Sequence, residues 1–166
     1  MKKYIIFGLL FLYIANGFSQ EKKVSMQLLS IIGVKNEIKI KFEFINSSEK
    51  DIAVYIPTSQ DICKKIFKIK FISTKDSTIH TYEPCTWYTD LSSIKFNCMN
   101  CIILSPEEKR IVNMTLSKKH FSPFLNINTY YKVFLAVYLK DVYIESVFSN
   151  YLKEDVSTNY IIYNNI

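Results

Sequence analysis

Glycine, proline and arginine are scarce in this chain of 166 residues, which has three glycines, four prolines and a single arginine, Arg110. So few glycines exclude collagen-like repeats, and a hydrophobic content of 49% excludes a disordered chain. The other 20 of the 21 basic residues are lysines. Because recognition of bases and phosphates relies on the bidentate guanidinium of arginine, no nucleic acid is expected as a partner.

The chain also lacks segments with a helical hydrophobic stripe, and two-residue alternation takes their place. In residues 37–44, Ile38, Ile40, Phe42 and Phe44 face one way and charged side chains face the other, which predicts a half-buried strand. Further strands are expected at residues 24–32, 52–56, 66–72, 78–82, 110–116, 130–139 and 142–148, the last two as a hairpin across residues 140–141.

These short strands predict the fold class. Without crossover helices to connect parallel neighbours, they indicate an all-β, antiparallel β-sandwich of seven to eight strands, in a single domain spanning residues 20–166. The predicted core consists of Ile38, Ile40, Phe42, Phe44, Phe67, Ile69, Phe71, Val133, Leu135 and Val137. Residues 130–139 are almost continuously apolar, which is typical of a central strand covered on both faces.

Residues 1–19 have the features of a secretory signal peptide. Lys2 and Lys3 precede a run of 12 apolar residues, and Gly17 and Ser19 stand before a cleavage site at Gln20. A permanent membrane anchor is the weaker reading, because a bilayer span needs about 20 apolar residues; a buried N-terminal strand is weaker still. Cleavage lowers the net charge from +6 to +4 and predicts a periplasmic or secreted protein with no stable membrane span.

Two motifs resemble those of bacterial immunoglobulin-like domains. Residues 104–108, Leu-Ser-Pro-Glu-Glu, are similar to a Leu-x-Pro-x-Glu turn, and Tyr131 is similar to the tyrosine that opens a long strand in such domains. The likeness covers roughly residues 35–150. Val133 stands where antibody domains have an inter-sheet cysteine. The resemblance implies an immunoglobulin-like sandwich and carries over no active site.

The four cysteines, Cys63, Cys85, Cys98 and Cys101, are all in the mature chain, and an even number in an exported protein predicts two disulfides. Three connectivities are open, of which Cys63–Cys85 with Cys98–Cys101 is favoured. Cys98 and Cys101 also have the spacing of thiol-redox enzymes, although no helix start is evident to activate them. The four thiols together could hold zinc, but only one close pair is present. No metal or cofactor is expected.

The connection from Cys85 to Cys101 is the least strand-like long segment and contains Trp87 and Tyr88. Aromatic side chains on a loop of a rigid sandwich are suitable binding anchors, so these two residues form the predicted contact site. The alternative is that Trp87 covers the neighbouring disulfide and closes one end of the core.

No sequence motif predicts catalysis. Serine never stands in a Gly-x-Ser-x-Gly elbow, and the two histidines, His80 and His120, lack evident partners. We therefore expect an exported, non-catalytic binding or interaction module, of which inhibitors and immunity proteins are examples, with another envelope or extracellular protein as its partner. One alternative is a small exported thiol-redox or metal-dependent enzyme that uses the cysteines. Another is a carbohydrate-binding component, of which coplanar aromatic side chains on one sheet face would be the sign.

Overall fold

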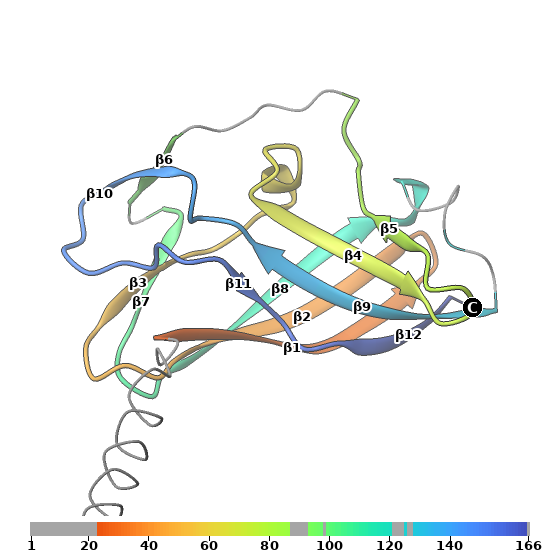
Figure 1. Cartoon of the computed structure of the whole chain (residues 1–166), viewed down its shortest axis with the longest axis horizontal. Coiled ribbons are helices and arrows are strands. Elements are labelled where there is room, and N and C mark those ends of the chain that lie inside the picture. The colour runs from red at the N-terminus through yellow and green to blue at the C-terminus, as the bar shows by residue number, and fades with distance from the viewer. Residues whose placement is uncertain (1–22, 87–92, 98, 121–124, 126–127, 166) are drawn as a thin grey trace, which may run out of the picture.

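The computed structural model of the chain describes residues 23–86, 93–97, 99–120, 125 and 128–165. These residues form twelve strands and two short 3-10 helices (Figure 1). The elements are β1 (Val24–Val34), β2 (Glu37–Asn46), β3 (Ile52–Tyr55), η1 (Ser59–Ile62), β4 (Phe67–Ser73), β5 (Ile79–Thr81), β6 (Ser93–Phe96), β7 (Cys101–Leu104), β8 (Lys109–Ser117), η2 (Lys118–His120), β9 (Thr129–Val137), β10 (Tyr143–Ser146), β11 (Val156–Ser157) and β12 (Ile161–Asn165). The prediction of an all-β chain is confirmed, and the predicted signal peptide lies outside the described residues.

Two antiparallel sheets form the body of the molecule. One has the strand order β1-β2-β8, and the other has the order β11-β9-β4-β5, with β12 also paired to β9. In Figure 1 the β4–β9 sheet lies over the β1–β2–β8 sheet. This arrangement is compatible with a β-sandwich, because each sheet turns its apolar face toward the other.

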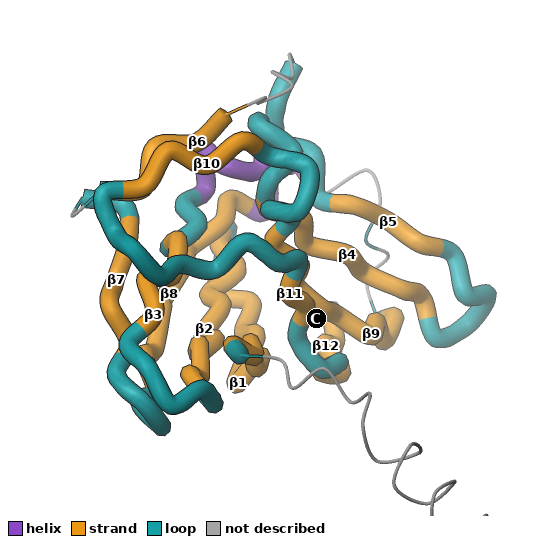
Figure 2. The backbone as a smooth tube through the Cα atoms, turned by 60° about the vertical axis from the view of Figure 1, so that its left-hand side comes forward, coloured by secondary structure: helices purple, strands orange, loops and turns teal. Residues whose placement is uncertain are grey.

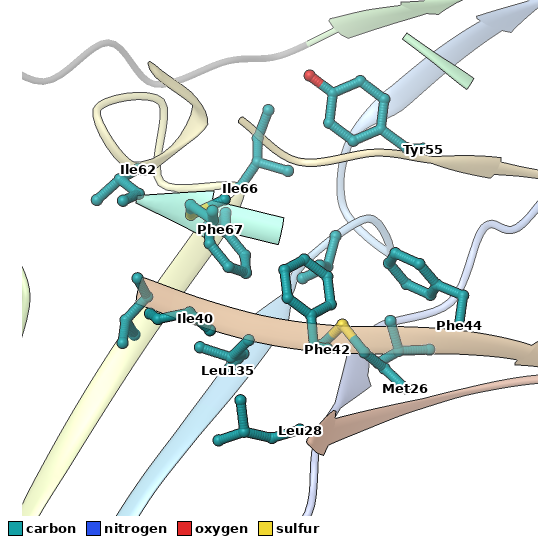
Figure 3. Packing of buried hydrophobic residues seen from close by; sticks show 14 of the residues in the cluster. Met26, Leu28, Ile40, Phe42, Phe44, Tyr55, Ile62, Ile66, Phe67 and Leu135 are labelled. Atoms are coloured by element: carbon teal, nitrogen blue, oxygen red, sulfur yellow. The ribbon is translucent and has the colours of Figure 1, made fainter. Parts of the chain in front are cut away.

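The core between the sheets is the one predicted from alternation. All ten predicted core residues are buried, with exposed fractions of at most 2%. The ring of Phe42 on β2 stacks on Phe67 of β4 at a centroid distance of 6.1 Å, and it meets Phe44 edge-on at 5.8 Å (Figure 3). The two sheets therefore contact each other through these aromatic rings as well as through aliphatic side chains.

One prediction about strand pairing is wrong. The segment after β9 does not fold back on it as a hairpin, because β10 pairs in parallel with β6. Asp155 explains the difference: its Oδ1 accepts hydrogen bonds from the backbone N–H groups of Leu139 and Lys140, both at 2.8 Å, where the chain leaves β9. The edge of β9 then pairs with β11 and β12. With β6 and β7 these short strands raise the number from the predicted seven or eight to twelve among the described residues.

Four strands form a bent two-stranded ribbon, in which the β2–β8 ladder is followed by the β3–β7 ladder. The β2–β8 ladder ends at the pair Ile45 and Lys109, and the β3–β7 ladder begins at the pair Ile52 and Leu104. Figure 2 shows β3 and β7 grouped with β6 and β10 at one end of the molecule, away from β4 and β5.

Asn46 holds the bend of this ribbon together. Its side chain is fully buried, and its Nδ2 donates to the carbonyl oxygens of Leu104 and Lys50, both at 2.9 Å. Its Oδ1 accepts from the backbone N–H and the hydroxyl of Ser48, at 2.9 and 2.7 Å. The backbone N–H of Asn46 donates to the carbonyl of Glu108. Every polar group of this buried amide is therefore satisfied, as burial requires.

The turn between β4 and β5 supplies a prediction about pH. The backbone N–H of Thr78 donates to Asp76 Oδ1 at 3.0 Å, and this bond, with smaller contributions from the side chains of Thr78 and Ser73, lowers the pKa of Asp76 to about 2. The folded pKa is below the unfolded value of about 3.9. The stabilisation is therefore complete above about pH 4 and is lost as the pH falls toward 2.

An NMR titration of the Asp76 carboxyl carbon should show a midpoint close to 2, and Asp76→Asn should remove this part of the acid dependence of stability. A midpoint at the ordinary value for an aspartate would contradict the hydrogen bond.

Candidate functional site

The Cys63–Cys85 disulfide is formed, with Cα atoms 5.7 Å apart, so this predicted pairing is confirmed. Cys63 directly follows η1, and Cys85 lies four residues beyond the end of β5. The bridge therefore ties the loop before β4 to the segment after β5 and fixes both ends of that hairpin.

Cys101 has a free thiol in this structure, so the predicted Cys98–Cys101 bridge is not formed there; Cys98 itself lies outside the described residues. The Sγ atom of Cys101 lies 3.3 Å from Oδ1 of Asn100, the preceding residue. Burial raises the pKa of the Cys101 thiol to about 12, against a weaker lowering by the backbone of Asn97. A thiol with this pKa is almost entirely protonated at neutral pH and is a poor nucleophile.

Neither His80 nor His120 belongs to a metal-binding cluster. Among the described residues, no group of three or more histidine, cysteine or carboxylate side chains is placed to hold a metal ion. His80 packs against the ring of Tyr131 at a centroid distance of 6.4 Å, and His120 packs against Tyr82 at 6.2 Å. Both imidazoles are therefore parts of aromatic packing.

Among the residues that the structure describes, no helix is long and apolar enough to span a bilayer.

The predicted contact residues Trp87 and Tyr88 lie outside the described residues. Within the described part of the chain, the side chains that gather most clearly by type lie on the outer face of the β4–β9 sheet. We call this surface the lysine–aromatic face. It consists of Lys68, Lys70, Tyr130, Lys132, Phe134, Tyr138 and Tyr160.

Strand alternation places these residues on one surface. In the β4–β9 register Lys68 lies opposite Ala136, Lys70 opposite Phe134, and Ile72 opposite Lys132. Successive side chains of a strand point to opposite faces. In β4 and β9, the residues that alternate with the core residues therefore point outward. The three lysines therefore lie in a row that runs along the strands.

Two of the three lysines of this row lie over aromatic rings. Lys68 Nζ lies 4.9 Å from the ring centroid of Tyr138, and Lys70 Nζ lies 5.5 Å from that of Phe134. The ring of Phe134 meets Tyr160 edge-on at 5.1 Å, with an interplanar angle of 63°. Tyr160 and Tyr130 are more than half exposed. The face therefore presents ammonium groups and partly accessible rings side by side.

The five strands of this sheet contain no carboxylate. Lys68, Lys70 and Lys132 are their charged residues, while Asp and Glu are absent from β4, β5, β9, β11 and β12. Glu83 stands at the rim, where it lines the same hollow as Lys65 and Lys68. The opposite sheet differs, because the outer face of β2 has Lys39 and Lys41 between two glutamates. The strands of this sheet therefore carry only positive charge, and Glu83 lies beside Lys68 at the edge of the lysine–aromatic face.

The lysine–aromatic face was not predicted from the sequence, because residues 130–139 were interpreted as a strand covered on both faces. The continuous apolar run predicts a strand covered on both sides, and β9 is indeed central, between β4 and the short strands β11 and β12. Apart from Ala136, however, its outer side chains remain half-buried or exposed, with Tyr130 at 53%. The available signal was the pair Lys68 and Lys70, because lysines on a neighbouring strand show that the same sheet face is open to solvent.

No family model, curated protein or solved structure matches this chain.

Proposed function

We propose that this chain is an exported, non-catalytic binding module that contacts another protein of the envelope or extracellular space through its lysine–aromatic face. The aromatic rings and lysines of this face are the observation that supports the proposal. Accessible aromatic rings are enriched at protein interfaces, and a surface with one charge sign favours a partner of the opposite sign. The surrounding strands hold these side chains on a rigid sheet, which keeps the contact surface ordered before binding.

We infer that the sandwich has an immunoglobulin-like topology. Strands β1, β2 and β8 form one sheet, while β4, β9 and β12 belong to the other, which corresponds to the division of strands A, B and E from C, F and G. The turn before β8 agrees with the resemblance noted in the sequence, since Glu108 Oε2 accepts from the backbone N–H of Ser105 at 2.9 Å. Tyr131 is buried against Phe71.

Export is supported by two independent features. The lysine-flanked run of 12 apolar residues at the N-terminus has the length of a signal-peptide core. The Cys63–Cys85 bridge needs an oxidising compartment to form and persist. A partner in the periplasm or outside the cell follows from this proposal.

Carbohydrate binding is the second candidate, because aromatic side chains on one sheet face favour it. The rings of Phe134 and Tyr160 nevertheless meet at 63°, so they do not make the flat platform on which sugar rings stack. A thiol-redox enzyme is less well supported, because the raised pKa of Cys101 disfavours the thiolate that such chemistry needs.

The test is affinity capture by the mature chain with two charge-reversal variants. Lys68→Glu with Lys70→Glu alters the lysine–aromatic face, and Lys39→Glu with Lys41→Glu makes the same change in net charge on the other sheet, where both lysines are exposed. Quantitative mass spectrometry of proteins captured from an envelope extract should show a partner bound by the wild type and by the control. The face variant should lose it at an unchanged melting temperature.

Equal capture by all three proteins would contradict the proposed face. Equal loss with both variants would show that net charge alone drives the association.

A further inference from the structure

We propose that the ligand of the lysine–aromatic face is an extended acidic polypeptide segment with carboxylates at alternate positions, which lies along β4. This inference rests on the proposed function and names the chemistry of its partner. The observation behind it is the spacing of the ammonium groups on a strand, taken together with the absence of carboxylates from the sheet.

The spacing of the lysines matches that of an extended peptide. Lys68 and Lys70 stand two residues apart on β4, which separates their Cα atoms by about 6.6 Å. Carboxylates at every second position of an extended chain repeat with the same period and point to the same side. Two successive acidic side chains can therefore reach Lys68 and Lys70, and the next reaches Lys132, which pairs with Ile72 one step further along.

The charge of the face selects an acidic ligand. The charged residues in the five strands of this sheet are the three lysines, and Glu83 lies beside Lys68, at one end of the row. A ligand that lies along β4 thus meets no repulsive carboxylate between the first ammonium and the last. Such a field speeds association with acidic partners and weakens as salt is added.

The aromatic rings restrain two of the lysine side chains in the free protein. Lys68 lies over Tyr138 and Lys70 over Phe134, so each long side chain is restrained before a partner arrives. Restraint of a flexible side chain in the free protein reduces the conformational entropy lost on binding. The exposed part of Tyr160, beside Phe134, adds apolar contact for the stem of an acidic side chain.

The experiment uses the mature full-length chain and two capped peptides of equal composition, each with three glutamates and four threonines. In one peptide the glutamates are at every second position. In the isomer they are at every third position, so that successive carboxylates point to opposite faces of an extended chain. Fluorescence anisotropy of labelled peptides should show about tenfold tighter binding of the first peptide, with affinity falling between about 50 mM and 300 mM salt.

Matched variants locate the binding. Lys70→Glu should weaken binding of the alternating peptide about tenfold, whereas Lys41→Glu, an equal change of charge on β2, should change it less than about twofold. Lys70→Gln removes the charge without reversing it and should give an intermediate loss. Circular dichroism on each variant checks that the fold is retained.

Three outcomes would overturn the inference: equal affinity for the two peptides, equal losses in Lys70→Glu and Lys41→Glu, or preference for an acidic polysaccharide or for phosphatidylglycerol vesicles over the alternating peptide. Failure of the proposed function is distinguishable from these results. If the natural partner is still lost with the face variant while the alternating peptide does not bind, the face is the contact surface and only the ligand class is wrong.

Discussion

Truncation of Phe42 to alanine is expected to lower the free energy of unfolding by about 3–5 kcal/mol, the usual cost of removing a buried aromatic ring and leaving a cavity. Phe42 is completely buried and contacts a ring from its own strand and another, Phe67, from the facing sheet. The loss therefore falls where the two sheets meet. Urea denaturation followed by circular dichroism measures it directly.

The matched control is Ile111→Ala on β8, since Ile111 is 48% exposed on the outer side of the same sheet. Its effect should stay within about 1 kcal/mol. If Phe42→Ala costs no more than this control, the face of β2 is not packed against β4 and the two-sheet core is wrong.

Removal of the Cys63–Cys85 bridge is the second large effect. The Cys63→Ala, Cys85→Ala variant should lose about 3 kcal/mol of stability, because the bridge closes a loop with a sequence separation of 22 and so limits the unfolded chain. Thermal unfolding of the variant should match that of reduced wild-type protein. A variant as stable as the oxidised wild type would show that the hairpin of β4 and β5 is held by its pairing alone.

Alternation predicted the core because it depends only on local geometry. In β2 the side chains of Ile38, Ile40 and Phe42 repeat with the two-residue period of a strand, and one face of the sheet is fully buried, so no long-range information was needed to place them. The Cys63–Cys85 pairing was similarly accessible, since both cysteines flank a predicted hairpin.

Pairing between strands that are distant in the sequence could not be predicted from local alternation. Where the chain leaves β9, the backbone donates to Asp155, which lies 16 residues from Leu139, and β10 pairs with the distant strand β6. The short strands β11 and β12 then pair with β9. Strands of two to five residues give too little alternation to be recognised in a sequence.

The candidate site was missed for a related reason. Apolar residues such as Phe134 and Tyr138 indicate burial when they are considered alone, and only the pairing of β9 with β4 shows that lysine side chains share their side of the sheet. The cation–π contacts follow from that register. The predicted site at Trp87 and Tyr88 stays a prediction.

The buried amide of Asn46 has a consequence for production of the protein. Asn46, Ser47 and Ser48 form an Asn-x-Ser acceptor for N-linked glycans, and a secretory pathway that glycosylates would present this sequence to its enzyme before the chain folds. A glycan on Nδ2 would replace one of its two N–H donors, so that one of the bonds to Leu104 and Lys50 would be lost, and it would have no space at a fully buried side chain. Eukaryotic secretion should therefore yield glycosylated, unfolded chain. Export in a bacterium that does not glycosylate leaves Asn46 unmodified, so that its hydrogen bonds at the bend of the ribbon can form.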